Sequence, residues 1–507
     1  MAEFLTRWRA MFARLSMVPL AFLGVGLYRA WIATFFRYGA YPALGYPDYA
    51  LFEASIGVVS FACALLARRA APLWSNQRAL ITCGASMTLG SLGLVVTAQA
   101  LPGALGLAGP LSLTSATTGA ALALAIGKTV SLIAAGGGLG ILILVWCEFF
   151  GALNPMRVAI YHGAAILFGE AFFWLFMGLE PAFIAVFSVV MPLVSLGSAH
   201  RSIASLPHAE RPHDGELTRG AAIPWKPIAL MAICTFAMQF AMMPGAPMVA
   251  GNVIGVALAC LIVILGSLST SRWFNFDTIY RVAFPLVCAT SLLVTPLLGG
   301  SDHPQATALF FDGGYTMMSM FIMIVLANIT YRFGISATWL NGIERGIRYI
   351  VETLGWGTYV LTATVLPTGA NQAVHLGVAV TVFVAFLAIV LSEKSLAARW
   401  GIDLHAGARE ARDGVSAGAT VRPDPFAAGQ LSLRVSDLSK ARGLSDREEE
   451  ILQLMARRVP MAQMEENLFV ARGTIKAHTS RIYKKLGVHS REELYEMIGV
   501  GPEESST

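Results

Sequence analysis

The sequence predicts an all-α protein: a polytopic bundle of transmembrane helices followed by a small helical domain at the C-terminal end. Hydrophobic residues make up 56% of the 507 residues and charged residues only 13%, a balance outside the range of soluble globular proteins. The apolar residues recur from Leu15 to Leu391 in blocks of about 20, the length that crosses the hydrocarbon core of a bilayer. After Leu391 the blocks stop, and capping signals typical of short soluble helices take their place.

The apolar blocks predict about twelve spans, grouped six and six. The longest polar connection runs from His200 to Lys226 and separates the two groups. No small-residue cleavage site follows the first block, which predicts an uncleaved span rather than a signal peptide. The fourth block is long enough to be tilted or broken at Gly136 to Gly138. The predicted spans are 15–36, 50–67, 79–100, 121–150, 157–177, 181–199, 227–243, 247–268, 282–300, 309–330, 347–366 and 373–392.

The distribution of Lys and Arg predicts the orientation of these spans. Counted from an inside N-terminus, the cytoplasmic loops hold sixteen basic residues and the opposite loops hold only Arg37. Positive charge is retained on the cytoplasmic side, so we expect a multi-pass protein of the inner (cytoplasmic) membrane with both termini in the cytoplasm. The sixteen residues are Arg7, Arg9, Arg14, Arg68, Arg69, Arg78, Arg157, Arg201, Arg211, Arg219, Lys226, Arg272, Arg281, Arg332, Arg345 and Arg348.

Composition divides the chain into four parts. Residues 1–392 form the transmembrane part. Residues 393–443 are rich in Ala, Gly, Arg and Asp and have no sustained apolar period, which predicts a flexible cytoplasmic linker. Residues 444–499 form the C-terminal domain, and residues 500–507 a short tail.

Local signals in the C-terminal domain mark where its helices begin and end. Ser445 and Glu448 have the S-x-x-E spacing of a capping box, and Ser490 and Glu493 repeat it. Gly487 is placed to end the helix before it. The domain is therefore expected to consist of short, capped helices.

The helix that Gly487 ends is predicted to have an apolar and a basic face. At about 100° per residue, Ile475, Ile482 and Leu486 fall within a narrow arc that faces a core. The domain holds nine basic and nine acidic residues, yet the stretch 471–486 holds five basic residues and no acid. Positive charge concentrated on one helix is what phosphate binding requires; the alternative is a solvated basic helix without a partner.

Residues 444–498 resemble the LuxR-type DNA-binding domain, which implies a four-helix unit with a helix-turn-helix. The chain departs from the family pattern at Arg458, Pro460 and Ala471; a missing capping hydroxyl at Ala471 predicts a loss of about 1 kcal/mol in stability. The matching residues are Leu444, Arg447, Glu448, Ile451, Leu452, Leu468, Thr474, Ile475, Lys476, His478, Ile482, Lys485, Leu486, Gly487, Val488 and Arg491.

The resemblance implies a recognition helix that lies in the major groove of double-stranded DNA. Base edges would be read by Lys476, Ala477 and Ser480. Phosphate contacts, which position the domain without specifying sequence, would come from Arg472, Thr474, Arg481, Lys484 and Lys485.

The resemblance also implies that the domain pairs as a homodimer on DNA. The fourth helix places Leu494, Met497 and Ile498 on one face, the candidate dimer surface. The alternative role of this face is to seal the core of its own domain.

Charged residues within the predicted spans are candidates for a ligand site. Ionised groups in a bilayer are costly unless they are paired or hydrated, so Arg29, Glu53 and Lys128 either line a small-molecule cavity, or form structural ion pairs or extend their charged ends to the membrane surface. Glu148 is expected at the cytoplasmic interface. No catalytic triad, phosphate loop, metal-ligand spacing or CxxC pair accompanies the six cysteines, so neither an enzyme nor a cofactor or metal is expected.

The 6+6 arrangement resembles the major facilitator superfamily in architecture. The loop RRAAPLWSNQR at 68–78 lacks the aspartate and glycines of that family's signature, which argues against active transport. The sequence therefore favours a membrane-bound transcription regulator that responds to a small molecule. A transporter of the major-facilitator type with a regulatory C-terminal domain is the alternative, and an adaptor that uses the domain only for protein contacts is a third.

Overall fold

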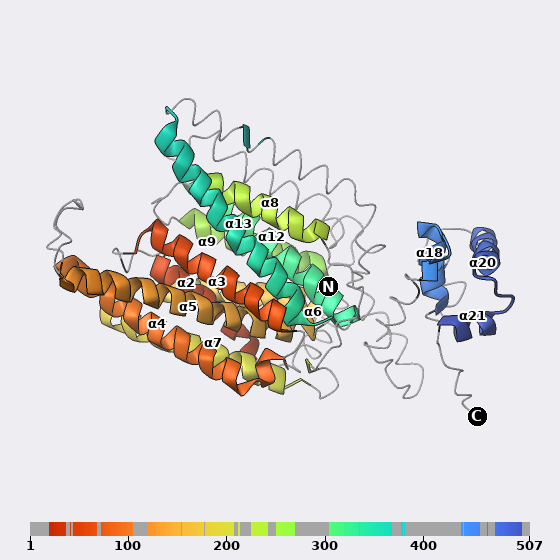
Figure 1. Ribbon diagram of the computed structural model, residues 1–507, viewed down its shortest axis with the longest axis horizontal. Helices are drawn as coiled ribbons and strands as arrows, with labels where there is room; N and C mark the ends of the chain where they lie inside the picture. Colours follow the sequence, from red (N-terminus) through yellow and green to blue (C-terminus); the bar gives the residue numbers. More distant parts are fainter. Residues whose placement is uncertain are drawn as a thin grey trace, which may run out of the picture.

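All regular structure in the described residues is helical, which confirms the predicted all-α fold class (Figure 1). The computed structural model describes residues 20–36, 41, 44–67, 72–104, 119–153, 155–176, 178–206, 211–212, 225–241, 250–268, 304–333, 335–367, 377–378, 380, 435, 438–439, 441–456, 464 and 472–498. The helices of residues 20–365 share one hydrophobic core, and those of residues 435–498 share another.

The first half of the bundle runs from a 3₁₀ turn, η1 (Leu20–Leu23), through six α-helices, with a second turn, η2 (Leu73–Ser75), between α3 and α4. The six are α2 (Gly24–Phe36), α3 (Tyr46–Leu66), α4 (Gln77–Ala104), α5 (Gly119–Gly151), α6 (Pro155–Phe176) and α7 (Pro181–Ala204). The second half contributes α8 (Trp225–Ala241), α9 (Ala250–Leu268), α12 (Pro304–Phe333) and α13 (Ala337–Val365).

Six helical segments in the described part of the chain are long and apolar enough to cross a membrane. Their outer faces carry large apolar side chains, and Leu65, Leu89 and Leu175 are each 64–65% exposed; apolar surface of this extent is expected where lipid replaces water. The total of twelve spans stays a prediction, because 282–300 lies wholly and 373–392 almost wholly outside the described residues. The six segments are Pro47–Leu66, Gln77–Thr97, Leu122–Gly151, Pro155–Phe176, Ala182–Ala204 and Gln305–Tyr331.

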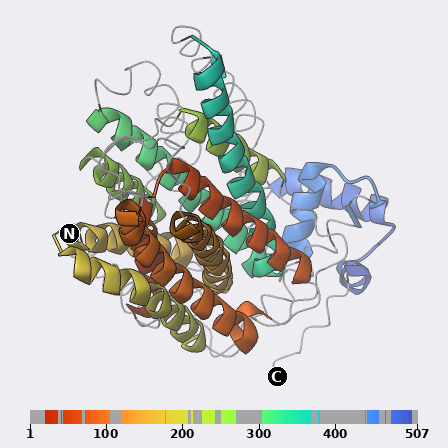
Figure 2. The same ribbon diagram turned by 60° about the vertical axis from the view of Figure 1, so that its left-hand side comes forward.

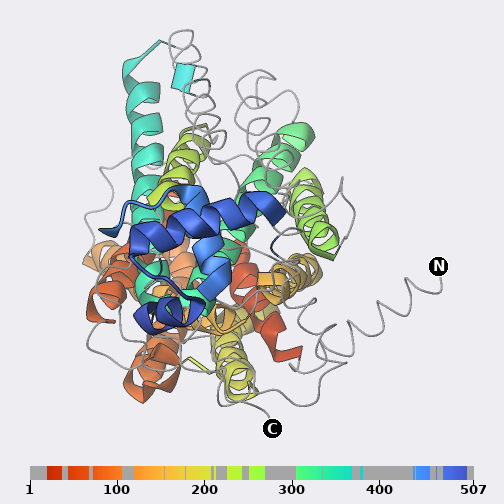
Figure 3. The ribbon, with the colours of Figure 1, turned by 90° about the vertical axis from the view of Figure 1, so that its right-hand side faces the viewer.

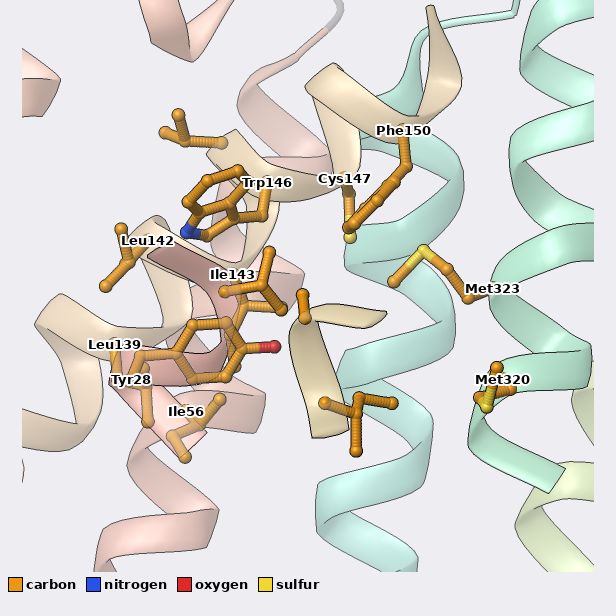
Figure 4. Close-up of a cluster of buried hydrophobic side chains, with 14 of the residues drawn as sticks. Tyr28, Ile56, Leu139, Leu142, Ile143, Trp146, Cys147, Phe150, Met320 and Met323 are labelled. Atoms are coloured by element: carbon orange, nitrogen blue, oxygen red, sulfur yellow. The ribbon is translucent and has the colours of Figure 1, made fainter. Parts of the chain in front are cut away.

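The two halves of the bundle share their core through α13, which packs along both α3 and α8, and through α9 and α12, which contact α6 (Figures 1 and 2). α5 lies at the centre. Its side chains Leu142, Trp146 and Phe150 are buried together with Tyr28 of α2 and Met323 of α12 (Figure 4). A polar group placed in this interior therefore has helices, not lipid or water, on every side.

Of the two alternatives for the fourth span, tilted or broken, the structure excludes the break, because α5 is one continuous helix through Gly136 to Gly138. The glycines serve close packing instead. A Cβ on Gly136 would lie 2.5 Å from the carbonyl oxygen of Phe52 in α3, closer than any side chain tolerates. Small residues commonly let transmembrane helices approach in this way.

The helix that contains the eleventh predicted span begins before residue 347, because α13 starts at Ala337 and Ser336 accepts from the backbone N–H of Trp339 as its N-cap. Arg345 and Arg348, counted above as loop charges, therefore lie inside a helix and are 5% and 2% exposed. These two residues no longer count as loop charges. The remaining basic residues still favour the same predicted orientation.

The C-terminal domain is built from α18 (Asp446–Ala456), α20 (Arg472–Leu486) and α21 (Arg491–Ile498), which cross one another (Figure 3). Met464 adds a buried helical residue, but the rest of the predicted second helix, with Arg458 and Pro460, lies outside the described residues, as does Ala471. The count of four helices therefore stays a prediction.

The packed C-terminal unit begins before the predicted boundary at residue 444. Val435 is fully buried in the C-terminal core, and Leu438 packs against that core. Both residues fall in the segment predicted to be a flexible linker, so the last part of that segment belongs to the domain. The remainder, from 393 to 434, lies outside the described residues.

Candidate nucleic-acid interface and buried polar centre

A capping box opens α18 as predicted. The Ser445 N–H donates to the Glu448 carboxylate at 2.8 Å, and the Glu448 N–H donates back to the Ser445 hydroxyl at 3.4 Å. The two bonds satisfy backbone donors that the first turn of a helix leaves without partners. The start of α18 is therefore fixed by its own side chains.

The two faces of α20 are confirmed. Ile475, Ile482 and Leu486 are at most 2% exposed and pack into the C-terminal core. Gly487 ends the helix with φ +74°, a backbone conformation that glycine adopts without steric cost. The core and this stop together fix how α20 is rotated, and so which residues it presents to solvent.

The exposed face of α20 carries the predicted base-reading residues and most of the predicted phosphate contacts. Lys476, Ala477 and Ser480 are exposed on it. A groove of about 560 Å³ runs along the same helix and continues to Val488 and His489. Among the residues predicted to contact phosphate, the structure describes four side chains, all exposed: Thr474, Arg481, Lys484 and Lys485. The side chain of Arg472 is not among the described ones.

Lys485 is engaged within the domain. Its ammonium donates to the Glu448 carboxylate at 2.7 Å and to the backbone carbonyl of Gly443 at 2.9 Å. A phosphate contact by Lys485 would compete with these bonds, whereas Lys484 has none of them in the described structure. The phosphate role of Lys485 stays a prediction, and its structural role is the better supported of the two.

The Glu448 carboxyl is held in its ionised form. The Lys485 ammonium and the Ser445 N–H both donate to it, and together they lower its pKa to about 2, with Lys485 the larger cause. Hydrogen bonds to a carboxylate favour the charged state. The pair therefore links α18 to the C-terminal end of α20 at neutral pH.

The fourth-helix face divides between its two possible roles. Leu494 and Ile498 are 0% and 2% exposed and belong to the domain's own core, whereas Met497 is 42% exposed. Ser490 caps α21 by accepting from the Glu493 N–H at 3.0 Å, but the Glu493 carboxylate accepts from His489, one residue earlier than a capping box requires. Of the three candidate dimer residues, Met497 is the one available to a partner.

The three predicted cavity residues are not brought together. Lys128 forms an ion pair with Asp48 at 2.9 Å, with both side chains partly exposed. Glu53 is instead 4% exposed and hydrogen-bonded to Glu352 of α13. Lys128 therefore takes the structural role that the sequence left open, while Arg29 and Glu53 face a different set of charges.

That set is a buried polar centre, defined here as the α13 residues Asn341, Glu344, Arg345, Arg348 and Glu352 with Arg29, Glu53 and His162 around them. At about 100° per residue, these α13 residues fall within an arc of about 100° and so lie on one helical face. Sequence reasoning missed this face because hydropathy assigned its first half to a loop. The signal that would have found it is the same i, i+3, i+4, i+7 periodicity, read for polar residues instead of apolar ones.

Glu148 is buried where the end of α5 meets two other segments, and its expected location at the cytoplasmic interface stays a prediction. It accepts from the backbone N–H groups of Leu73 and Trp74 at 2.8 and 2.9 Å, and from the Thr338 hydroxyl at 2.5 Å. The carboxylate thereby joins the end of α5 to η2 and to the start of α13. Within the described residues, no group of three or more His, Cys, Asp or Glu is placed to hold a metal.

Comparison with known families identifies the C-terminal domain. Residues 442–498 match the family model described as bacterial regulatory proteins, luxR family. A comparison of the whole chain with curated proteins found no match. The matched segment covers α18, α20 and α21 and begins two residues before the predicted domain boundary, so the chain carries a LuxR-family helix-turn-helix DNA-binding domain.

Proposed function

We propose that this protein is a membrane-anchored transcription regulator: residues 1–392 embed it in the inner membrane, and residues 444–499 bind double-stranded DNA on the cytoplasmic side. The domain acts as a homodimer, and the membrane half responds to a small-molecule ligand. Nothing in the proposed mechanism requires an enzymatic step or a cofactor.

The observation that carries the DNA-binding role is the rotation of α20. Its apolar face is sealed in the C-terminal core, so Lys476, Arg481 and Lys484 are directed to solvent on a helix without acidic residues. A helix that presents basic side chains next to short polar ones suits the major groove, because lysine bonds guanine acceptors while neighbouring cations bind phosphates. The family match covers the same helix.

We infer membrane anchoring from the apolar outer surface of the bundle and from the length of its helices. Six described segments suffice to cross a bilayer. Because DNA lies in the cytoplasm, a cytoplasmic C-terminus is required by the function and agrees with the distribution of basic residues. The two arguments are independent of each other.

Transport remains the second candidate, and the buried polar centre is the observation that favours it, since charged groups inside a bundle commonly mark substrate or proton pathways. Uptake into vesicles that contain the full chain separates the two functions. The regulator predicts ligand binding without accumulation of the ligand inside the vesicle.

DNA capture from membranes tests the regulator directly. Cells that express the full chain are cross-linked, and the DNA bound to washed, solubilised membranes is recovered with the protein. We expect discrete DNA sites for the unmodified chain, loss of them in Arg481→Glu/Lys484→Glu, and no loss in the control Arg201→Glu, which changes an exposed residue near the end of α7. Equal recovery from the double variant and the unmodified chain contradicts the proposal.

A further inference from the structure

The α13 face of the polar centre places ionised groups where water does not reach. Glu344, Arg345 and Arg348 are 1%, 5% and 2% exposed. Removing such groups from water is energetically unfavourable unless partners within the protein replace the water. Whether the hydrogen-bond partners of these groups are complete therefore indicates whether the site is purely structural or binds a further molecule.

Hydrogen-bond partners are incomplete on both sides of this cluster, because both carboxylate oxygens of Glu344, like the guanidinium groups, lack a partner in the described residues. Glu344 lies 3.3 Å from the Nε of Arg345 and 3.8 Å from the Nε of Arg348, close enough to balance charge. Neither contact meets hydrogen-bond geometry. The Nε of Arg29, Arg345 and Arg348 and one Nη of Arg348 are buried without an acceptor in the described part of the chain. Four guanidinium N–H sites on two helices are thus left for a molecule that brings its own acceptors.

The acidic residues nearby do not compensate for this. Glu53 and Glu352 are hydrogen-bonded to each other. The two carboxyl groups are thus engaged with each other across α3 and α13. Gln239 of α8 donates to Glu352 as well, which holds that carboxyl on the side of α8.

Arg348 lies where helices from both halves of the bundle converge. It is within electrostatic range of Tyr28 of α2, Glu53 of α3, His162 of α6 and Tyr315 of α12. A molecule bound to Arg348 would contact several of these helices at once. Its binding can therefore bias how the two halves pack, which is the property that a sensor requires.

We propose that the polar centre around Arg348 binds a small organic ligand through a carboxylate group. A guanidinium presents its N–H donors as a planar fork that matches the two oxygens of a carboxylate, and such charge-assisted pairs are about twice as strong as neutral hydrogen bonds. The inference rests on the proposed regulator function and names the class of ligand that its membrane half takes.

Three carboxylates of increasing size serve as probes: acetate, benzoate and octanoate, each compared with its neutral amide at equal ionic strength. Thermal unfolding of the full chain in detergent is followed by tryptophan fluorescence. We expect at least one carboxylate to raise Tm saturably by about 2–5 °C, with no such shift from its amide. The shift should vanish in Arg348→Gln and persist in Lys128→Gln, whose ion pair with Asp48 lies outside the polar centre.

Arg348→Lys covers the case in which Arg348→Gln does not fold, because it keeps the charge but removes the fork and should weaken carboxylate binding at least tenfold. The inference is overturned if no carboxylate shifts Tm more than its amide, or if folded variants at residue 348 bind as tightly as the unmodified chain. DNA binding is measured on the same preparations. Intact DNA binding without any carboxylate effect refutes the ligand class alone, whereas loss of DNA binding in the unmodified chain refutes the regulator.

Discussion

The Lys485 ammonium lies 2.7 Å from the Glu448 carboxylate and joins the C-terminal end of α20 to the first turn of α18. The Glu448 side chain is 4% exposed and that of Lys485 is 38% exposed. Glu448 also accepts from the Ser445 N–H, so the capping box and the ion pair share one carboxylate. The pair thus ties α20 to α18 through Lys485, a residue that the sequence assigned to a phosphate contact.

Substitution of Lys485 tests this structural role. Lys485→Met should lower the free energy of unfolding of fragment 430–507 by about 1–2 kcal/mol, because it leaves a nearly buried carboxylate without its cation. Lys484→Ala, which alters the neighbouring exposed lysine, should change stability by less than about 0.5 kcal/mol. Urea denaturation followed by circular dichroism measures both. Equal stability of the two variants would show that the ion pair contributes nothing.

The same pair predicts a pH dependence of stability. Because the folded pKa of Glu448, about 2, lies below its ordinary value of 4.5, the ionised form stabilises the folded domain. That contribution is complete above about pH 4.5 and is lost as the pH falls towards 2. Since Lys485 is partly solvated, we expect about 1–2 kcal/mol across this window.

Urea titrations of fragment 430–507 between pH 2 and pH 6 measure the effect. Glu448→Gln should flatten the curve in this window, and Glu492→Gln, which alters an exposed carboxyl of α21, should not. A Glu448→Gln curve that is as steep as that of the unmodified fragment would assign the acid sensitivity to other groups.

The two roles of α21 are separable by substitution. Leu494→Ala should destabilise the domain by about 2–4 kcal/mol, because it opens a cavity in the C-terminal core. Met497→Ala should leave stability nearly unchanged and weaken binding to a two-half-site duplex, if the exposed side chain contacts a partner domain. Denaturation and DNA titration of the same samples are the measurements. Unchanged DNA affinity in Met497→Ala would place the dimer contact elsewhere.

The orientation of the chain is tested by reporters fused after Thr507. The basic residues of the loops and the even number of predicted spans predict that a reporter active only in the periplasm is silent there, and that one active only in the cytoplasm works. Fusions at Arg37, in the one predicted outer loop that holds a basic residue, provide the matched control. A silent cytoplasmic reporter after Thr507, together with an active periplasmic one, would contradict the predicted topology.

Local signals made the C-terminal domain predictable from sequence. Ser445 and Glu448 fix a helix start through bonds within four residues, and Ile475 with Ile482 marks a buried face by periodicity alone. The helix stop at Gly487 is likewise a signal that depends on neighbouring residues alone. Such features need no knowledge of distant contacts, so they are found where they were predicted.

Features that depend on tertiary contacts were not predictable in this way. Arg345 and Arg348 lower the hydropathy of the start of α13, so they were counted as loop charges, although the packing of α13 within the bundle buries them. Val435 was missed for the related reason that one or two apolar residues in a polar segment show no period. The partner of Lys485 was also invisible, because Glu448 lies 37 residues earlier and only the fold brings the two together.

The central claim is that the exposed face of α20 reads DNA sequence, and Lys476 is the residue that tests it. Lys476 points away from the core formed by Ile475 and Ile482. If it bonds a guanine, Lys476→Ala should weaken binding to the preferred site by about 1–3 kcal/mol and relax preference at one base pair. Lys484→Ala should weaken preferred and scrambled DNA alike and reduce the salt slope by about one unit.

The most direct measurement selects preferred duplexes from a random library with the full chain in detergent. Lys476→Ala and Lys484→Ala are then titrated against preferred and scrambled duplexes at several salt concentrations, with circular dichroism to verify folding. The account predicts that Lys476→Ala reduces the ratio of the two affinities about tenfold or more, while Lys484→Ala leaves that ratio unchanged. A folded Lys476→Ala variant with undiminished discrimination, or a full chain that binds no DNA in a salt-dependent manner, would contradict it.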